Sequence, residues 1–194
     1  VGRECWGIEH RVLYGRPDDP RTWQQLDAIL QRQYSMQNGV HVSVACACVD
    51  SGDGTYTTNV YHYTKARERM RVFAIKGRGG IGVPFINTPT KSNAMKATLF
   101  TLGVDSGKSL VMNRLSVQEP GPNFAHYAAQ EDRGFSENFF KQLTAEVLEK
   151  HFEKGVVKMA WKKIRERNEA LDCAVYATAA LELLNPNFEF LADF

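Results

Sequence analysis

Hydrophobic and polar positions follow two different spacings along the chain. Short runs of apolar, aromatic and β-branched residues predict strands, and apolar residues three or four positions apart predict helices. The predicted strands cover residues 5–14, 40–49, 71–75, 96–104, 124–127 and 156–161. The predicted helices cover residues 20–38, 55–67, 106–115, 137–150 and 168–184. Because strands and helices alternate without an internal linker, we expect residues 1–194 to form one α/β domain.

Two segments depart from this regular alternation. Residues 40–49 are almost continuously apolar, which is typical of a buried central strand, and the run stops at Asp50-Ser51-Gly52-Asp53-Gly54. Residues 76–93 are rich in glycine, proline and lysine and show no periodicity, which predicts a long surface loop. Loops of this length are uncommon in compact domains unless they carry a function.

Composition narrows the class of protein. The 194 residues include 24 basic and 22 acidic side chains, for a formal net charge of +2, and 43% are hydrophobic. These values exclude disordered, collagen-like and coiled-coil chains. No stretch approaches the roughly 20 apolar residues of a membrane span, so we expect no membrane partner. Four scattered cysteines exclude a disulfide framework or a paired-cysteine zinc site and fit a reducing compartment.

Asp50 is the first candidate for chemistry, because it stands where the apolar run ends. Ligands gather at the carboxyl ends of strands in open α/β sheets, and a carboxylate there can hold a hard cation. Asp53, in the same loop, could support Asp50 in binding the cation. The alternative interpretation is a plain Asp-Gly turn.

Glu169 and Asp172 open the final helix and lie three residues apart, on one helix face. Acidic residues also stabilise a helix N-terminus through its dipole, which is the structural alternative. Together with Asp50, these carboxylates could bind two divalent cations of the kind that cleave phosphodiesters.

Basic residues form two runs, each interrupted by a single acid. The runs are Lys65, Arg67, Arg69, Arg71, Lys76 and Arg78, and Lys158, Lys162, Lys163, Arg165 and Arg167. They predict either a solvated face or contacts with a nucleic-acid backbone that read little sequence. The candidate DNA contacts are Lys76, Arg78, Lys162, Lys163 and Arg167.

The segment 103–109 is similar to a phosphate-binding loop, but its glycines are separated by three residues instead of four. We therefore expect a capped helix start there and no ATP site. The five histidines show no paired metal-ligand spacing.

Several short motifs, taken in order, resemble the nuclease domain of bacteriophage terminase large subunits of the GpA type, from lambda-like DNA-packaging motors. The motifs are Trp6 with the strand to Gly15, Val-Asp-Ser-Gly at 49–52, Val-Tyr at 60–61, Arg-Val-Phe-Ala-Ile-Lys-Gly at 71–77, Leu-Gly-Val-Asp-Ser-Gly-Lys at 102–108, Gln-Leu-Thr-Ala-Glu at 142–146 and Arg-Asn-Glu-Ala-Leu-Asp-Cys at 167–173. They span nearly the whole chain.

The resemblance implies a ribonuclease H-like fold, with a mixed central sheet flanked by helices. It implies an endonuclease that uses Mg²⁺ or Mn²⁺, two ions in all, to cut concatemeric double-stranded viral DNA in the host cell cytoplasm. Asp50, Glu169 and Asp172 match the family's catalytic, metal-binding acids. Lys76 is a candidate for a phosphate contact, and the alternative is a lysine on the surface of a glycine-rich loop. The terminase small subunit and the capsid portal are the implied protein partners.

The chain departs from the family pattern at its start. Family members carry another acid in a Gly-Ile-Asp strand upstream of Trp6, and that strand is not among these residues. Since the chain begins at Val1, we expect a fragment whose first strand and ATPase domain lie upstream. Two alternatives stay open: a non-catalytic DNA-binding or assembly module, and another ribonuclease H-like nuclease such as a resolvase or transposase.

Overall fold

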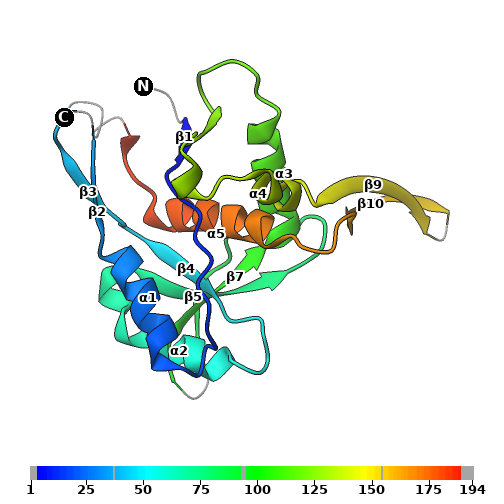
Figure 1. Ribbon diagram of the computed structural model, residues 1–194. Coiled ribbons are helices and arrows are strands. Elements are labelled where there is room, and N and C mark those ends of the chain that lie inside the picture. The colour runs from blue at the N-terminus through cyan, green and yellow to red at the C-terminus, as the bar shows by residue number, and fades with distance from the viewer. Residues whose placement is uncertain (1–3, 37, 93–94, 154, 189–194) are drawn as a thin grey trace.

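A computed structural model describes residues 4–36, 38–92, 95–153 and 155–188, which form a mixed α/β domain (Figure 1). The strands are β1 (Cys5–Gly7), β2 (Gln33–Ser35), β3 (His41–Ser43), β4 (Ala47–Asp50), β5 (Val72–Arg78), β6 (Thr90–Lys91), β7 (Thr98–Gly103), β8 (Ala125–Tyr127), β9 (Glu146–Glu153) and β10 (Val156–Lys163). The helices are α1 (Pro20–Leu30), α2 (Thr57–Ala66), α3 (Val104–Leu115), α4 (Glu137–Leu143) and α5 (Glu169–Leu184), with short 3-10 helices at Glu68–Met70 and Glu131–Arg133.

The central sheet has the strand order β4-β5-β7-β6. Strands β4, β5 and β7 are parallel, and β6 is antiparallel to β7. Helix α5 covers one face of the sheet and α2 the other (Figure 1). The parallel strands therefore end at one edge of the sheet, with Asp50 opposite Ile75.

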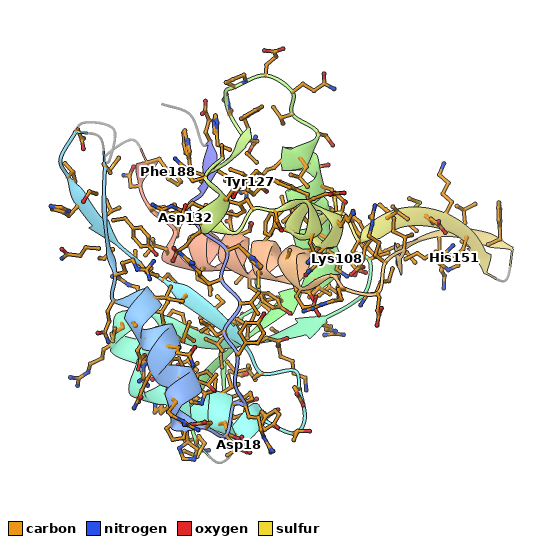
Figure 2. All side chains as sticks on the ribbon, viewed as in Figure 1. Asp18, Lys108, Tyr127, Asp132, His151 and Phe188 are labelled. Atoms are coloured by element: carbon orange, nitrogen blue, oxygen red, sulfur yellow. The ribbon has the colours of Figure 1, made fainter. Side chains whose placement is uncertain are left out.

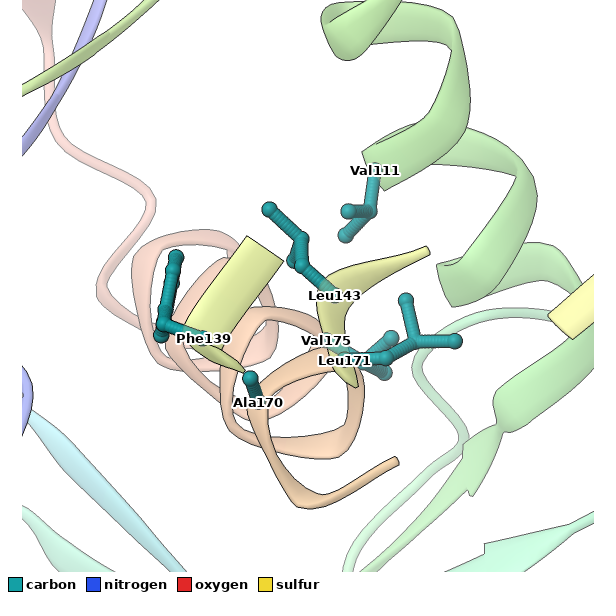
Figure 3. Close-up of a cluster of buried hydrophobic side chains, with 6 residues drawn as sticks. All are labelled: Val111, Phe139, Leu143, Ala170, Leu171 and Val175. Carbon is teal, nitrogen blue, oxygen red and sulfur yellow. The ribbon is translucent and has the colours of Figure 1, made fainter. Parts of the chain in front are cut away.

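The main core joins α3, α4 and α5 (Figure 3). Its buried residues are Val111, Phe139, Leu143, Ala170, Leu171 and Val175. A second cluster of Ile75, Leu102 and Ala179 seals α5 against the sheet. Burying each large side chain contributes about 1.5–3 kcal/mol, so these contacts fix the position of α5.

Two glycines of the 103–109 segment serve packing. A Cβ on Gly103 would lie 2.5 Å from the carbonyl oxygens of Val83 and Pro84. A Cβ on Gly107 would lie 2.6 Å from side-chain carbons of Phe85 and Val175. Helix α3 starts directly after β7, and no phosphate loop separates them. The predicted helix start is confirmed, but the predicted cap is wrong, because no side chain caps the helix at Gly103.

The predicted helix from residue 20 to 38 is wrong in its second half. Helix α1 ends at Leu30, and β2 and β3 then form an antiparallel hairpin around the turn that contains Asn38-Gly39. Asn-Gly is a strong hairpin signal, and it outweighs the helical spacing. The apolar run 40–49 is consequently split between β3 and β4. Among the described residues β4 pairs only with β5, so it is an edge strand and not the predicted central one.

The predicted helix 137–150 is also too long. Helix α4 ends at Leu143, and residues from Glu146 form β9, which pairs with β10 along its whole length. Pairing with β10, the next strand along the chain, therefore decides the structure of 146–150. The predicted strand 5–14 shrinks to β1, which pairs in parallel with β8.

The predicted loop 76–93 loses its first three residues to β5 and two more to β6. The remaining predicted helices and strands are confirmed to within a few residues. In the part of the chain that the structure describes, no helix is both long and apolar enough to cross a membrane.

Candidate functional site

Asp50 ends β4 at the carboxyl edge of the sheet, as the sequence predicts. The backbone N–H of Gly52 donates to its Oδ1 at 2.8 Å, and the Tyr176 hydroxyl donates to its Oδ2 at 3.1 Å. The first contact is a turn formed by the Asp-Ser-Gly sequence, and the second comes from α5. Asp50 is therefore oriented by its own loop and by the helix that covers the sheet.

A polar stripe begins at Asn168, the residue before α5, and runs along one face of this mostly apolar helix. Asn168, Asp172 and Tyr176 are spaced by four residues, which places them one above another on the helix. The Asn168 amide donates to Asp172 Oδ2 at 3.2 Å and to Glu146 Oε1 at 2.9 Å. The stripe thus contacts β4 through Tyr176 and β9 through Asn168.

Glu146 is a buried carboxylate whose charge is neutralised locally. The Lys108 Nζ donates to Glu146 Oε2 at 2.6 Å, and the two side chains are only 13% and 7% exposed. Figure 2 shows Lys108 near the start of α5. The pair ties α3 to the first residue of β9 beside the polar stripe.

The electrostatics show that three carboxylates share one region, which we call the acid cluster: Asp50, Glu146 and Asp172. Burial raises the pKa of Asp172, and the charges of Glu146 and Asp50 raise it further, while Lys108 and Lys163 oppose them. Burial and the neighbouring Asp50 also raise the pKa of the Tyr176 hydroxyl, which keeps it a hydrogen-bond donor.

The acid cluster fits a hard divalent cation in part. Within the described ranges, no group of three or more His, Cys, Asp or Glu side chains is placed to hold a metal ion. Asp50 and Asp172 offer two carboxylates, whereas Glu146 is engaged by Lys108 and Asn168. Mg²⁺ is usually held by one or two carboxylates, several waters and substrate phosphates, so this pair suffices for one ion.

Two other predicted acids lie outside the cluster. Glu169 is exposed and ion-paired with Arg167 at 3.2 Å, and a hydrogen bond from its own backbone N–H, together with Arg167, lowers its pKa. The Asp53 side chain accepts a hydrogen bond from the Thr55 backbone N–H within the loop. The structure therefore brings Asp50 and Asp172 together but not Glu169.

The predicted basic contacts occupy different surfaces. Lys76 and Arg78 are exposed at the end of β5, just beyond the residue opposite Asp50. Lys162 and Lys163 point to opposite sides of β10, because side chains alternate along a strand. Lys162 pairs with Glu149 at 3.1 Å, whereas Lys163 lies opposite Glu146 and its charge affects Asp172.

Sequence reasoning gave no role in the site to Lys108, Glu146, Asn168 or Tyr176, although the first three lie in the motifs at 102–108, 142–146 and 167–173. The spacing of Asn168, Asp172 and Tyr176 could have revealed the stripe, because these are polar positions four residues apart in an apolar helix. Glu146 was hidden by the wrong assignment of its segment to a helix.

Comparisons with known proteins agree over nearly the whole chain. The family described as "Terminase large subunit gpA, endonuclease domain" matches residues 1–191. The chain is 35% identical over 186 residues to "Terminase, large subunit" of Escherichia phage lambda, and 32% identical over 187 residues to the protein of the same name from Enterobacteria phage P21. Each match covers 94% of this chain and 29% of the relative.

The chain therefore spans less than a third of the length of these relatives. No solved structure matches it.

Proposed function

Since the chain belongs to the family of terminase large-subunit endonuclease domains, we propose that it cuts double-stranded DNA for packaging and does so at the acid cluster. The observation that carries this proposal is the convergence of Asp50 and Asp172 at the carboxyl edge of the sheet. A pair of carboxylates that can hold a cation, beside exposed basic residues that can hold phosphates, suits cleavage of a DNA backbone.

Asp50 and Asp172 would hold Mg²⁺ or Mn²⁺ through carboxylate oxygens. Such an ion supplies Lewis-acid chemistry, which activates water and stabilises charge on the reacting phosphate. Tyr176 donates to Asp50 and Asn168 donates to Asp172, so they would orient these two carboxylates toward the cation. Lys76, Arg78 and Lys163 would hold the DNA backbone.

The second ion of a two-ion mechanism would need another carboxylate. In the described part of the chain one edge of β4 has no partner strand, and a parallel strand from elsewhere in the protein that paired there would end beside Asp50. We propose that the upstream acid implied by the family pattern reaches the cluster in this way, within a ribonuclease H-like sheet. We likewise propose that the whole protein has an ATPase domain, contacts the terminase small subunit and the capsid portal, and works in the host cell cytoplasm.

The test compares two acids three residues apart on α5. We expect Asp172→Asn to lower Mn²⁺-dependent nicking of supercoiled plasmid by more than roughly a hundredfold, because even partners that only support a metal ligand are worth 10–100-fold. Glu169→Gln is the matched control and should nick like the wild type, since its carboxylate faces Arg167.

Equal nicking by the wild type and Asp172→Asn would overturn the assignment of the cluster. Loss of nicking in Glu169→Gln instead would return Glu169 to the metal site that the sequence predicts.

A further inference from the structure

Strands β9 and β10 form an antiparallel ribbon that extends from the body of the molecule (Figure 1). The strands pair without interruption from Glu146 opposite Lys163 to Glu153 opposite Val156. At about 3.3 Å per residue the ribbon is roughly 23 Å long. Its first residue belongs to the acid cluster, so the ribbon projects from the site itself.

The two faces of the ribbon differ in character. Side chains alternate along a strand, and residues opposite each other share a face. The face that includes Glu146, which we call the Glu146 face, also carries Leu148, Lys150, Phe152, Val157, Met159, Trp161 and Lys163. The opposite face carries Glu149, His151, Lys158 and Lys162, together with the smaller apolar residues Val147, Val156 and Ala160.

The base of the Glu146 face packs against α3. Glu146 is paired with Lys108, and the Trp161 indole N–H donates to the Asp105 carbonyl at 3.2 Å. Beyond this contact the face is open to solvent. Leu148, Phe152 and Val157 are 44%, 78% and 51% exposed, respectively.

The charges on the Glu146 face suit a polyanion. Lys150 is exposed between Leu148 and Phe152, and Lys163 is exposed near the base. The Glu146 carboxylate is neutralised by Lys108. A lysine in the middle of an apolar stripe disfavours a protein partner, because charged residues are depleted in the cores of protein interfaces.

We propose that this ribbon is a DNA-binding arm that lies in the major groove with its Glu146 face toward the duplex. The proposal rests on the proposed function of the acid cluster. The major groove is about 12 Å wide and admits a two-stranded ribbon. An arm of this length follows roughly seven base pairs. Lys150 and Lys163 bind phosphates, while Phe152 and Val157 contact base edges and methyl groups.

The experiment measures binding of a fluorescent 30-base-pair duplex in EDTA, so that cleavage does not interfere, over a series of salt concentrations. Lys150→Gln should reduce the slope of log affinity against log salt by about one, as expected for one lost phosphate contact. The matched control is Lys158→Gln, an exposed lysine on the opposite face, which should leave the slope unchanged.

A second pair of variants, at neighbouring residues of β9, tests the apolar contacts with DNA. Phe152→Ala should weaken binding about three- to tenfold, whereas His151→Ala on the other face should not. Thermal melting checks that every variant is folded, and light scattering records its oligomeric state.

The arm proposal is overturned if both members of either pair bind DNA alike. It is also overturned if Lys150→Gln and Phe152→Ala change the oligomeric state and not the affinity for DNA, which would make the ribbon a contact between copies. Failure of the proposed function gives a different result. Asp172→Asn would then still cut DNA, whatever the arm variants do to binding without metal.

Discussion

Asn168 connects two of the three carboxylates in the acid cluster. Its single amide nitrogen donates to both Asp172 and Glu146, and Glu146 is held in turn by Lys108. A lysine on α3 therefore influences the orientation of Asp172 without touching it. Asn168 is a positioning residue in this arrangement.

We expect Asn168→Ala to raise the Mn²⁺ concentration needed for half-maximal cleavage by roughly 10–100-fold, the usual range for residues that orient a metal ligand. Saturating Mn²⁺ should restore part of the rate, because Asp172 itself is retained. A titration of nicking rate against Mn²⁺ measures both effects. An unchanged half-maximal concentration would show that Asn168 has only a structural role.

Helices α3 and α5 approach each other closely at Gly107. A Cβ on this residue would lie 2.6 Å from side-chain carbons of Phe85 and Val175. Through this contact α3 presents Lys108 to Glu146 beside the polar stripe of α5. The glycine of the apparent phosphate-binding motif thus contributes to the site by packing.

Gly107→Ala should therefore lower the free energy of unfolding by about 1–3 kcal/mol, the usual cost of overpacking a core. In an exposed helix the same change would favour folding by up to about 1 kcal/mol. Urea denaturation measures the difference. Gly54→Ala serves as the control, since a Cβ there has no atom within 4 Å; a Gly107→Ala protein as stable as the wild type would rule out the close contact.

The elements that were predictable from sequence are those whose local pattern agrees with their environment. Helix α5 is long and mostly apolar, and β5 and β7 each contain a short apolar run that is buried or partly buried, so their structures follow from spacing alone. Strand β9 was missed because its structure depends on pairing with β10, which local spacing does not encode. The same reason hid Glu146, whereas Asp50 and Asp172 were found because each lies at the end of a clear element.

At the scale of the whole molecule, the ionised Asp172 carboxylate opposes folding. The pKa of Asp172 is raised in the folded protein, first by burial and then by Glu146 and Asp50. A raised carboxyl pKa means that the folded state binds a proton more tightly than the unfolded state. The contribution of Asp172 to stability is therefore complete below the ordinary pKa of 3.8 and is lost as the pH rises through the raised value.

We accordingly expect Asp172→Asn to melt at a higher temperature than the wild type at pH 7 without metal, and the difference to shrink as the pH is lowered toward 3.8. Mn²⁺ at a hundred times its dissociation constant should raise the wild-type melting temperature by roughly 5–10 °C and leave Asp172→Asn almost unchanged. Melting curves with Mn²⁺ and with EDTA measure both. A variant less stable than the wild type at pH 7 would contradict the electrostatic account.

The continuous pairing of β9 with β10 also determines which changes of length a related sequence can accept. Inserting one residue in β9 between Glu146 and Lys150 would exchange the two faces beyond that point and carry Lys150 and Phe152 to the other side. Residues added at the tip leave the register, and hence Glu146, where it is. Related chains are therefore free to evolve arms of different length by insertion or deletion at the turn, while the spacing from Glu146 to each arm residue is retained.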